Sequence, residues 1–169
     1  MSKEQLQTNN TKYTSLIQTL RRKATIGEDM LQQTINSTNS CYYLFYHYDG
    51  DNIDYIANLD TSNVTNMSYM FNGCSNLTSI PQLNTSNVTD MKFMFAECES
   101  LTILDLGNFN TENVTNMSCM FNLCKKLRRL DLSNFNKKNV TGMMSMFLYC
   151  NNLCELNLSG FDTSKVKDM

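Results

Sequence analysis

Seven cysteines and twelve methionines are the side chains of this sequence that could bind a soft metal ion. Structural zinc sites use close pairs such as Cys-x-x-Cys, with further cysteines or histidines nearby. Here four cysteines recur singly, and His47 is the one histidine. The odd number of cysteines also excludes a complete disulfide framework. We therefore expect no metal site and no cofactor, and we interpret the recurring thiols as reduced and buried side chains: Cys74, Cys98, Cys124 and Cys150.

The sequence contains no recognisable catalytic constellation. A single histidine removes the histidine-based triads of hydrolases. Serine, aspartate and glutamate are abundant, but they follow the repeats of the sequence, and no glycine-rich phosphate loop is present. We expect no catalytic residues, and the chain is not predicted to be an enzyme.

Polar side chains within a Leu-x-x-Leu-x-Leu pattern could instead bind a ligand. The pattern occurs three times between residues 101 and 158. If each copy forms a strand, its x positions face solvent and lie about 4.8 Å from those of the next strand. Arg129 then pairs with Glu155, while Asp105 and Asp131 repel each other unless a ligand or an arginine intervenes. The candidate ligand-binding residues are Asp105, Asp131, Asn157, Thr102, Arg128 and Arg129.

These patterns belong to a repeat of about 26 residues. Asn-Val-Thr opens four copies, and a Met-Phe pair, a cysteine and a leucine follow in a fixed order. Five valines mark the period, with spacings of 24, 26, 26 and 26 residues: Val64, Val88, Val114, Val140 and Val166.

Each repeat is predicted to form a short strand and a short helix. The Leu-x-Leu stretch alternates as a half-buried strand does, whereas Met117, Met120, Phe121 and Cys124 recur at spacings of three and four, as on one helical face. A preceding Thr-Asn pair could cap that helix. One unit cannot bury its apolar face alone, so stacked units must share a core. The predicted fold class is an α/β repeat, a leucine-rich-repeat-like solenoid with an N-terminal helical cap.

The predicted organisation has two parts. Residues 1–37 form a helical cap or attachment segment, and residues 38–169 form the solenoid. The last repeat is incomplete, so we expect either that further repeats have been cut away or that a second molecule covers this end by self-association. Within the solenoid we distinguish a degenerate first repeat (38–62), four repeats (63–164) and the incomplete repeat (165–169).

Composition narrows the range of partners. A formal charge of -2 and a pI of about 5.3 favour neither nucleic acid nor anionic membranes. No apolar stretch is long enough for membrane insertion, and the first 30 residues contain no signal peptide. One basic cluster could bind an anionic glycan or could simply be a solvated surface. It consists of Lys125, Lys126, Arg128, Arg129, Lys137 and Lys138.

Phe-x-x-Cys-x-x-Leu-x-x-Leu-x-Leu, joined to Asn-Val-Thr-Asn-Met-Ser-x-Met-Phe, resembles the BspA-like leucine-rich repeats of bacterial surface proteins. The resemblance covers about 63–169, with a degenerate extension to about 38. It implies a surface-exposed adhesin or lipoprotein with protein or matrix ligands and no enzymatic activity. Similar repeats occur in some protists and on phage particles.

Together these observations predict a non-catalytic binding or adhesion module with a protein or glycan ligand. The expected location is the cell surface, the extracellular space or a phage particle. The alternative is a structural or decoration component of a surface or phage-particle assembly, attached through residues 1–37.

Overall fold

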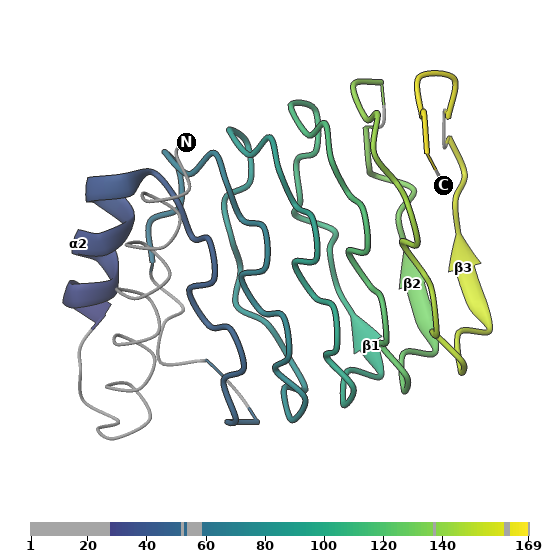
Figure 1. Cartoon of the computed structure of the whole chain (residues 1–169), viewed down its shortest axis with the longest axis horizontal. Helices are drawn as coiled ribbons and strands as arrows, with labels where there is room; N and C mark the ends of the chain where they lie inside the picture. The colour runs from purple at the N-terminus through teal and green to yellow at the C-terminus, as the bar shows by residue number, and fades with distance from the viewer. Residues whose placement is uncertain (1–27, 52, 54–58, 137, 161–162, 169) are drawn as a thin grey trace.

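The described residues form one helix, α2 (Glu28–Thr38), and one small sheet (Figure 1). The strands are β1 (Ile103–Leu104), β2 (Arg129–Asp131) and β3 (Glu155–Asn157), paired in parallel in the order β1-β2-β3. No described helix is long and apolar enough to cross a membrane. The structure is a computed structural model, and it describes residues 28–51, 53, 59–136, 138–160 and 163–168.

The predicted fold class, an α/β leucine-rich-repeat-like solenoid, is wrong. Apart from α2 and strands of two or three residues, the described backbone consists of turns and irregular segments. The helix expected through Met117, Met120, Phe121 and Cys124 is absent, and tight turns take its place.

These turns follow one another through each Met-Phe segment. The amide of Met120 donates to the carbonyl of Met117 at 3.2 Å. Cys119, the third residue of that turn, has a φ of 57°, as a type II turn requires, and a positive φ interrupts an α-helix. Successive turns also bury side chains at spacings of three and four, which is why the pattern suggested a helix. The same position has a positive φ at Tyr43, Tyr69, Phe93, Cys119 and Ser145.

Backbone hydrogen bonds join these turns to the next repeat. The Phe95 amide donates to the Met120 carbonyl, and the Phe121 amide donates to the Met146 carbonyl, each at 3.0 Å. A left-handed conformation costs a non-glycine residue about 1–2 kcal/mol, and these bonds help to offset that cost. Consecutive repeats therefore lie side by side (Figure 1), with isolated parallel bridges that link Ser40, Asn66, Asp90, Asn116, Gly142 and Asp168.

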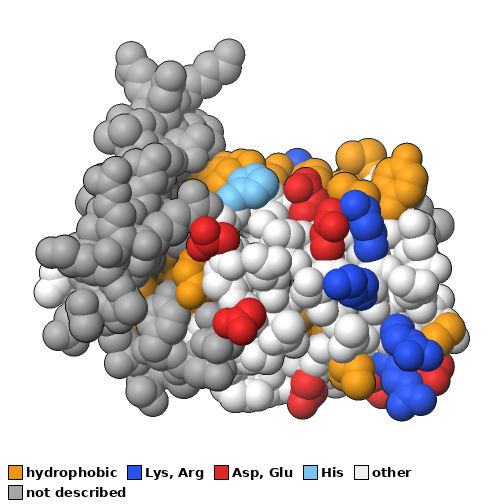
Figure 2. Space-filling view, turned by 90° about the horizontal axis from the view of Figure 1, so that it is seen from below, with side chains coloured by type: hydrophobic (Ala, Val, Ile, Leu, Met, Phe, Trp, Pro, Cys, Tyr) orange, Lys and Arg blue, Asp and Glu red, His pale blue; other side chains and the backbone are white. Residues whose placement is uncertain are grey.

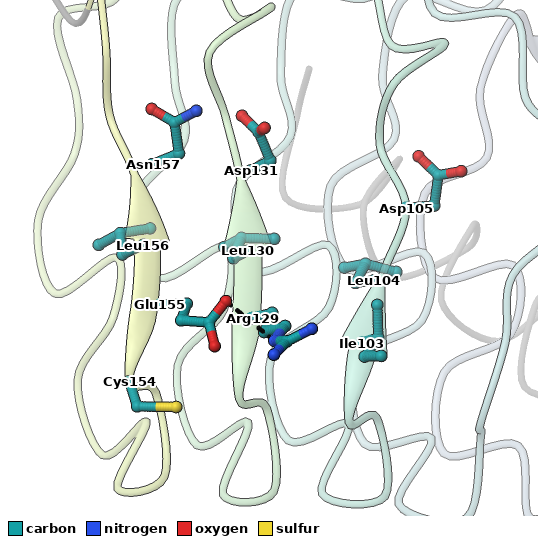
Figure 3. A pocket seen from close by; sticks show the side chains of 10 residues that line it. All are labelled: Ile103, Leu104, Asp105, Arg129, Leu130, Asp131, Cys154, Glu155, Leu156 and Asn157. Atoms are coloured by element: carbon teal, nitrogen blue, oxygen red, sulfur yellow. Dashed lines mark ion pairs between the residues drawn. The ribbon is translucent and has the colours of Figure 1, made fainter.

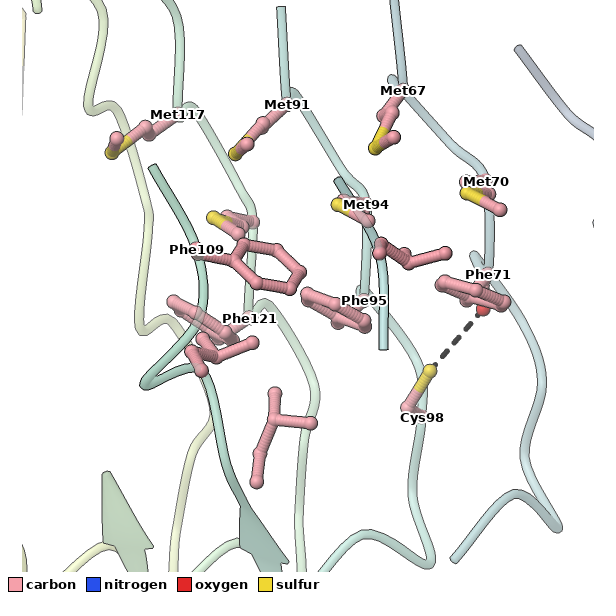
Figure 4. Close-up of a cluster of buried hydrophobic side chains, with 14 of the residues drawn as sticks. Met67, Met70, Phe71, Met91, Met94, Phe95, Cys98, Phe109, Met117 and Phe121 are labelled. Atoms are coloured by element: carbon pink, nitrogen blue, oxygen red, sulfur yellow. Dashed lines mark hydrogen bonds between the residues drawn. The ribbon is translucent and has the colours of Figure 1, made fainter. Parts of the chain in front are cut away.

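A stack of phenylalanine rings runs through the core (Figure 4). The Phe95 ring lies between those of Phe71 and Phe121, at centroid distances of 5.6 and 5.9 Å. Phe45 and Phe147 extend the stack at its two ends. Phe147 is only partly buried, but the other four rings are fully buried, and each contributes about 1.5–3 kcal/mol, so this stack is a principal source of stability. A parallel row of buried methionines lies along it: Met67, Met91 and Met117.

The recurring thiols join neighbouring repeats. The Cys98 thiol donates to the Phe71 carbonyl, with an Sγ–O distance of 3.2 Å (Figure 4). We predicted buried, apolar packing for the four recurring cysteines; Cys74, Cys98 and Cys124 are buried, whereas Cys150 is only partly buried, and all four are hydrogen-bond donors as well. Equivalent bonds of 3.0–3.1 Å run from Cys74, Cys124 and Cys150 to the carbonyls of Phe45, Phe95 and Phe121.

Threonine and asparagine side chains supply further bonds between repeats. The buried Thr85 hydroxyl donates to the Asn110 carbonyl at 2.9 Å and accepts the Asn110 amide at 2.8 Å. Asn116, expected at a helix start, instead accepts the Ser118 amide at 3.0 Å and closes a turn. No buried side-chain nitrogen or oxygen in the described part of the chain lacks a partner.

The two ends of the described core differ in exposure. At one end, Leu31 and Ile35 of α2 are buried in the core. At the other end, Leu156 is 38% exposed, whereas Leu130 at the equivalent position is 3% exposed. Most of the predicted segment 1–37 lies outside the described residues.

The full burial of Phe121, between Phe95 and Phe147 in the ring stack, predicts a large cost of truncation. Phe121→Ala should lower the free energy of unfolding by about 3–5 kcal/mol, because it removes the ring and leaves a cavity. Urea denaturation measures this change. A loss below about 1 kcal/mol would contradict the assignment of Phe121 to the core.

The positive φ of Ser145 predicts the opposite effect for a glycine substitution. Ser145→Gly should stabilise the fold by about 0.5–1 kcal/mol, because relief of the left-handed strain outweighs the entropy gained by the unfolded chain. Ser100→Gly is the matched control and should destabilise by about 0.5 kcal/mol, since Ser100 lacks a positive φ. Equal destabilisation by both changes would refute the turn geometry.

Candidate functional site

The outward positions of the three strands form rows across the sheet (Figure 3). The register places Ile103 beside Arg129 and Arg129 beside Glu155. Asp131 lies beside Asn157 in the same register, and Asp105 continues that row beyond the end of β1. The parallel pairing of short strands thus arranges side chains from three repeats on one surface.

Two adjoining depressions on this surface contain all six candidate residues. The larger is lined by residues of all three strands, among them Asp105, Asp131 and Asn157. The smaller contains Thr102 and Arg128. The two depressions share Ile103, Arg129, Cys154 and Glu155.

The row of Asp105, Asp131 and Asn157 has a structural role that the sequence analysis missed. One side-chain oxygen of each residue accepts the amide two residues later, at 2.9, 2.8 and 3.0 Å respectively. Such bonds close the turn after each strand. The need to close this turn explains why short acceptor side chains recur here, so their recurrence alone does not indicate a ligand.

Ion pairs between repeats partly neutralise the charges around the depressions. Nε of Arg129 lies 2.9 Å from Oε2 of Glu155, which confirms the predicted pair. Nζ of Lys125 lies 2.7 Å from Oε1 of Glu99. These side chains are all largely solvated, so each pair contributes only a few tenths of a kcal/mol. On the face shown in Figure 2, lysines and arginines gather toward one end, with acidic side chains close by.

An exposed apolar side chain lies among these charges. Ile103 is 61% exposed, and it lines both depressions between Thr102 and Leu104. Cys154 is also exposed and lines both depressions, and Arg128 lies between it and Thr102. The surface therefore combines apolar, hydroxyl, thiol and guanidinium groups.

The sequence analysis also missed a cluster of aromatic residues at the turns of the Met-Phe segments. The Tyr69 ring stacks on Tyr43 and Phe93, at centroid distances of 4.7 and 4.8 Å. Burial, followed by the proximity of Tyr43, raises the pKa of Tyr69 to about 12. Tyr42 and Tyr46 contact Tyr43 edge-on. The signal was present in the sequence, because Tyr43, Tyr69 and Phe93 follow the period of the repeat.

The buried thiols are poorly suited to thiolate chemistry. Burial raises the pKa of the Cys41 thiol to about 12 and raises the pKa of Cys98 and Cys124 well above the usual range. Thiols ligate metals and attack electrophiles as thiolates, which these values disfavour. Among the described residues, no three His, Cys, Asp or Glu side chains are grouped to hold a metal ion.

Comparison with known proteins places the repeats in a family. Residues 39–155 and 126–169 match the family described as "Mycoplasma protein of unknown function, DUF285". The chain belongs to the DUF285 family. No curated protein and no solved structure gave a significant match to this DUF285 chain.

The raised pKa of Cys41 predicts a loss of stability in alkali. An unfolded thiol ionises near pH 9, whereas the folded Cys41 thiol stays neutral to about pH 12. Its contribution is complete below pH 9 and falls by about 1.4 kcal/mol per pH unit above pH 9. Urea denaturation between pH 8 and about 10.5 should therefore show a shallower decline for Cys41→Ala than for the wild type. Parallel pH profiles would contradict the raised pKa.

Proposed function

We propose that this DUF285 chain is a non-catalytic binding module whose strand surface contacts a protein or glycan ligand outside the cell. One observation carries the proposal: four exposed side chains from two neighbouring repeats lie together and line the two adjoining depressions. They are Thr102, Ile103, Arg128 and Arg129. Hydroxyl, apolar and guanidinium groups are what a binding surface combines.

The hydrogen bonding of the framework supports this assignment. The side chains that hold the repeats together are threonines, asparagines and cysteines between the turns, such as Thr85, Asn113 and Cys98. By contrast, the side chains of Thr102, Ile103 and Arg128 are exposed on the same framework. Within the described part of the chain, they make no hydrogen bond to a neighbouring repeat. These positions can vary at little cost to the fold, as a recognition surface requires.

The resemblance to BspA-like surface repeats supports an extracellular adhesion role and a protein or matrix ligand. The carboxylates in the depressions are already engaged, since Asp105 accepts an amide and Glu155 pairs with Arg129. This engagement favours a binding role over acid–base catalysis.

Arrays of glycans and of extracellular matrix proteins test the proposal with the full chain. The wild type should bind a subset of the array, and Ile103→Ser with Arg128→Ser should weaken that binding at least tenfold, because it removes an apolar and a charged contact. The control is Met144→Ser with Lys165→Ser, which removes an apolar and a cationic side chain from exposed positions outside both depressions, and it should bind like the wild type. Binding unaffected by the first variant, or no binding at all, would overturn the proposal.

A further inference from the structure

One repeat concentrates positive charge on the surface. Lys125, Lys126, Arg128 and Arg129 lie within five consecutive positions, and all four are exposed. We call these four residues the basic strip. The equivalent positions of the two flanking repeats carry no lysine or arginine, since they hold Glu99, Ser100, Thr102 and Ile103 on one side and Asn151, Asn152, Cys154 and Glu155 on the other.

Acidic side chains restrain only part of the basic strip. Lys125 pairs with Glu99 in the preceding repeat, and Arg129 pairs with Glu155 in the following repeat. Within the described part of the chain, no ion pair engages Lys126 or Arg128. These two cations are therefore available to an external anion.

Arg128 has the surroundings that an anion requires. It lines the smaller depression, and Thr102 and Cys154 lie beside it in the two flanking repeats. A guanidinium group holds carboxylate or sulfate oxygens through paired N–H donors, and the Thr102 hydroxyl can add a further donor.

The flanking acids limit the shape of the ligand. Glu99 and Glu155 border the basic strip on its two sides, so a ligand wider than one repeat would meet a negative charge on each side. A nucleic-acid duplex needs a broad basic face, which a chain of net charge -2 does not favour. A narrow polymer with spaced anionic groups fits this arrangement better.

We propose that the basic strip binds an anionic polysaccharide, with Arg128 and Lys126 holding its sulfate or carboxylate groups. This inference rests on the proposed binding function and specifies its ligand class. Glu99 and Glu155 act as competing internal anions, and binding frees Lys125 and Arg129 to reach further groups on the polymer.

Affinity measurements with the full chain test the inference, with heparin as the sulfated probe, hyaluronan as the carboxylated probe and dextran as the neutral probe. The wild type should bind heparin or hyaluronan but not dextran, and the difference between the two anionic probes identifies the group that is recognised. Lys126→Gln with Arg128→Gln should weaken binding about tenfold or more. Glu155→Gln should strengthen it severalfold, because Arg129 is released.

The matched control is Lys165→Gln with Lys167→Gln, which removes the same charge from exposed positions outside the basic strip. It should bind like the wild type. Equal weakening by both double variants, absence of binding to both anionic probes, or tighter binding to polyglutamate or single-stranded DNA would overturn the inference. A ligand found on the arrays and lost with Ile103→Ser and Arg128→Ser would still uphold the proposed function, so the two failures are distinguishable.

Discussion

The structure depends on hydrogen bonding between the turns of successive repeats. Each Met-Phe segment places residues such as Tyr69 and Phe93 in the left-handed region, which exposes alternate amides to the carbonyls of the next repeat. An isolated segment would leave those groups to water and would bear the backbone strain without compensation. The same pairing fixes the spacing of the phenylalanine stack, with centroid distances of 5.4–5.9 Å from Phe45 to Phe147.

This constraint divides the side chains into two groups with different roles. Threonine, asparagine and cysteine side chains complete the bonding between repeats, and even Asp105 and Asp131 close local turns. Nearby side chains on the strand surface, such as those of Arg128 and Ile103, make none of these side-chain bonds and remain exposed, while the Arg128 backbone bonds to both flanking repeats. A framework held together by its turns can therefore present variable chemistry on its strand surface, as the proposed binding function requires.

The period of the repeat made part of this structure predictable. It identified the buried phenylalanines, three of the four recurring thiols as buried, and the pairing of Arg129 with Glu155. It could not distinguish a helix from successive turns, because both bury Met117, Met120 and Phe121 at the same spacings, and only the backbone reveals the positive φ of Cys119. The bonds that Asp105 and Asp131 make within their own turns were also missed. The prediction considered only contacts between repeats, whereas each carboxylate accepts the amide two residues later in its own repeat.

NMR measurement of backbone φ angles, together with amide hydrogen exchange, tests most directly whether bonded turns hold the repeats together. The account predicts positive φ angles at Tyr69, Phe93 and Cys119, and slow exchange of the Phe95 and Phe121 amides, whose acceptors lie in the next repeat. Negative, helical φ angles through Met117 and Cys124, with protection that follows bonds four residues back along the chain, would contradict it.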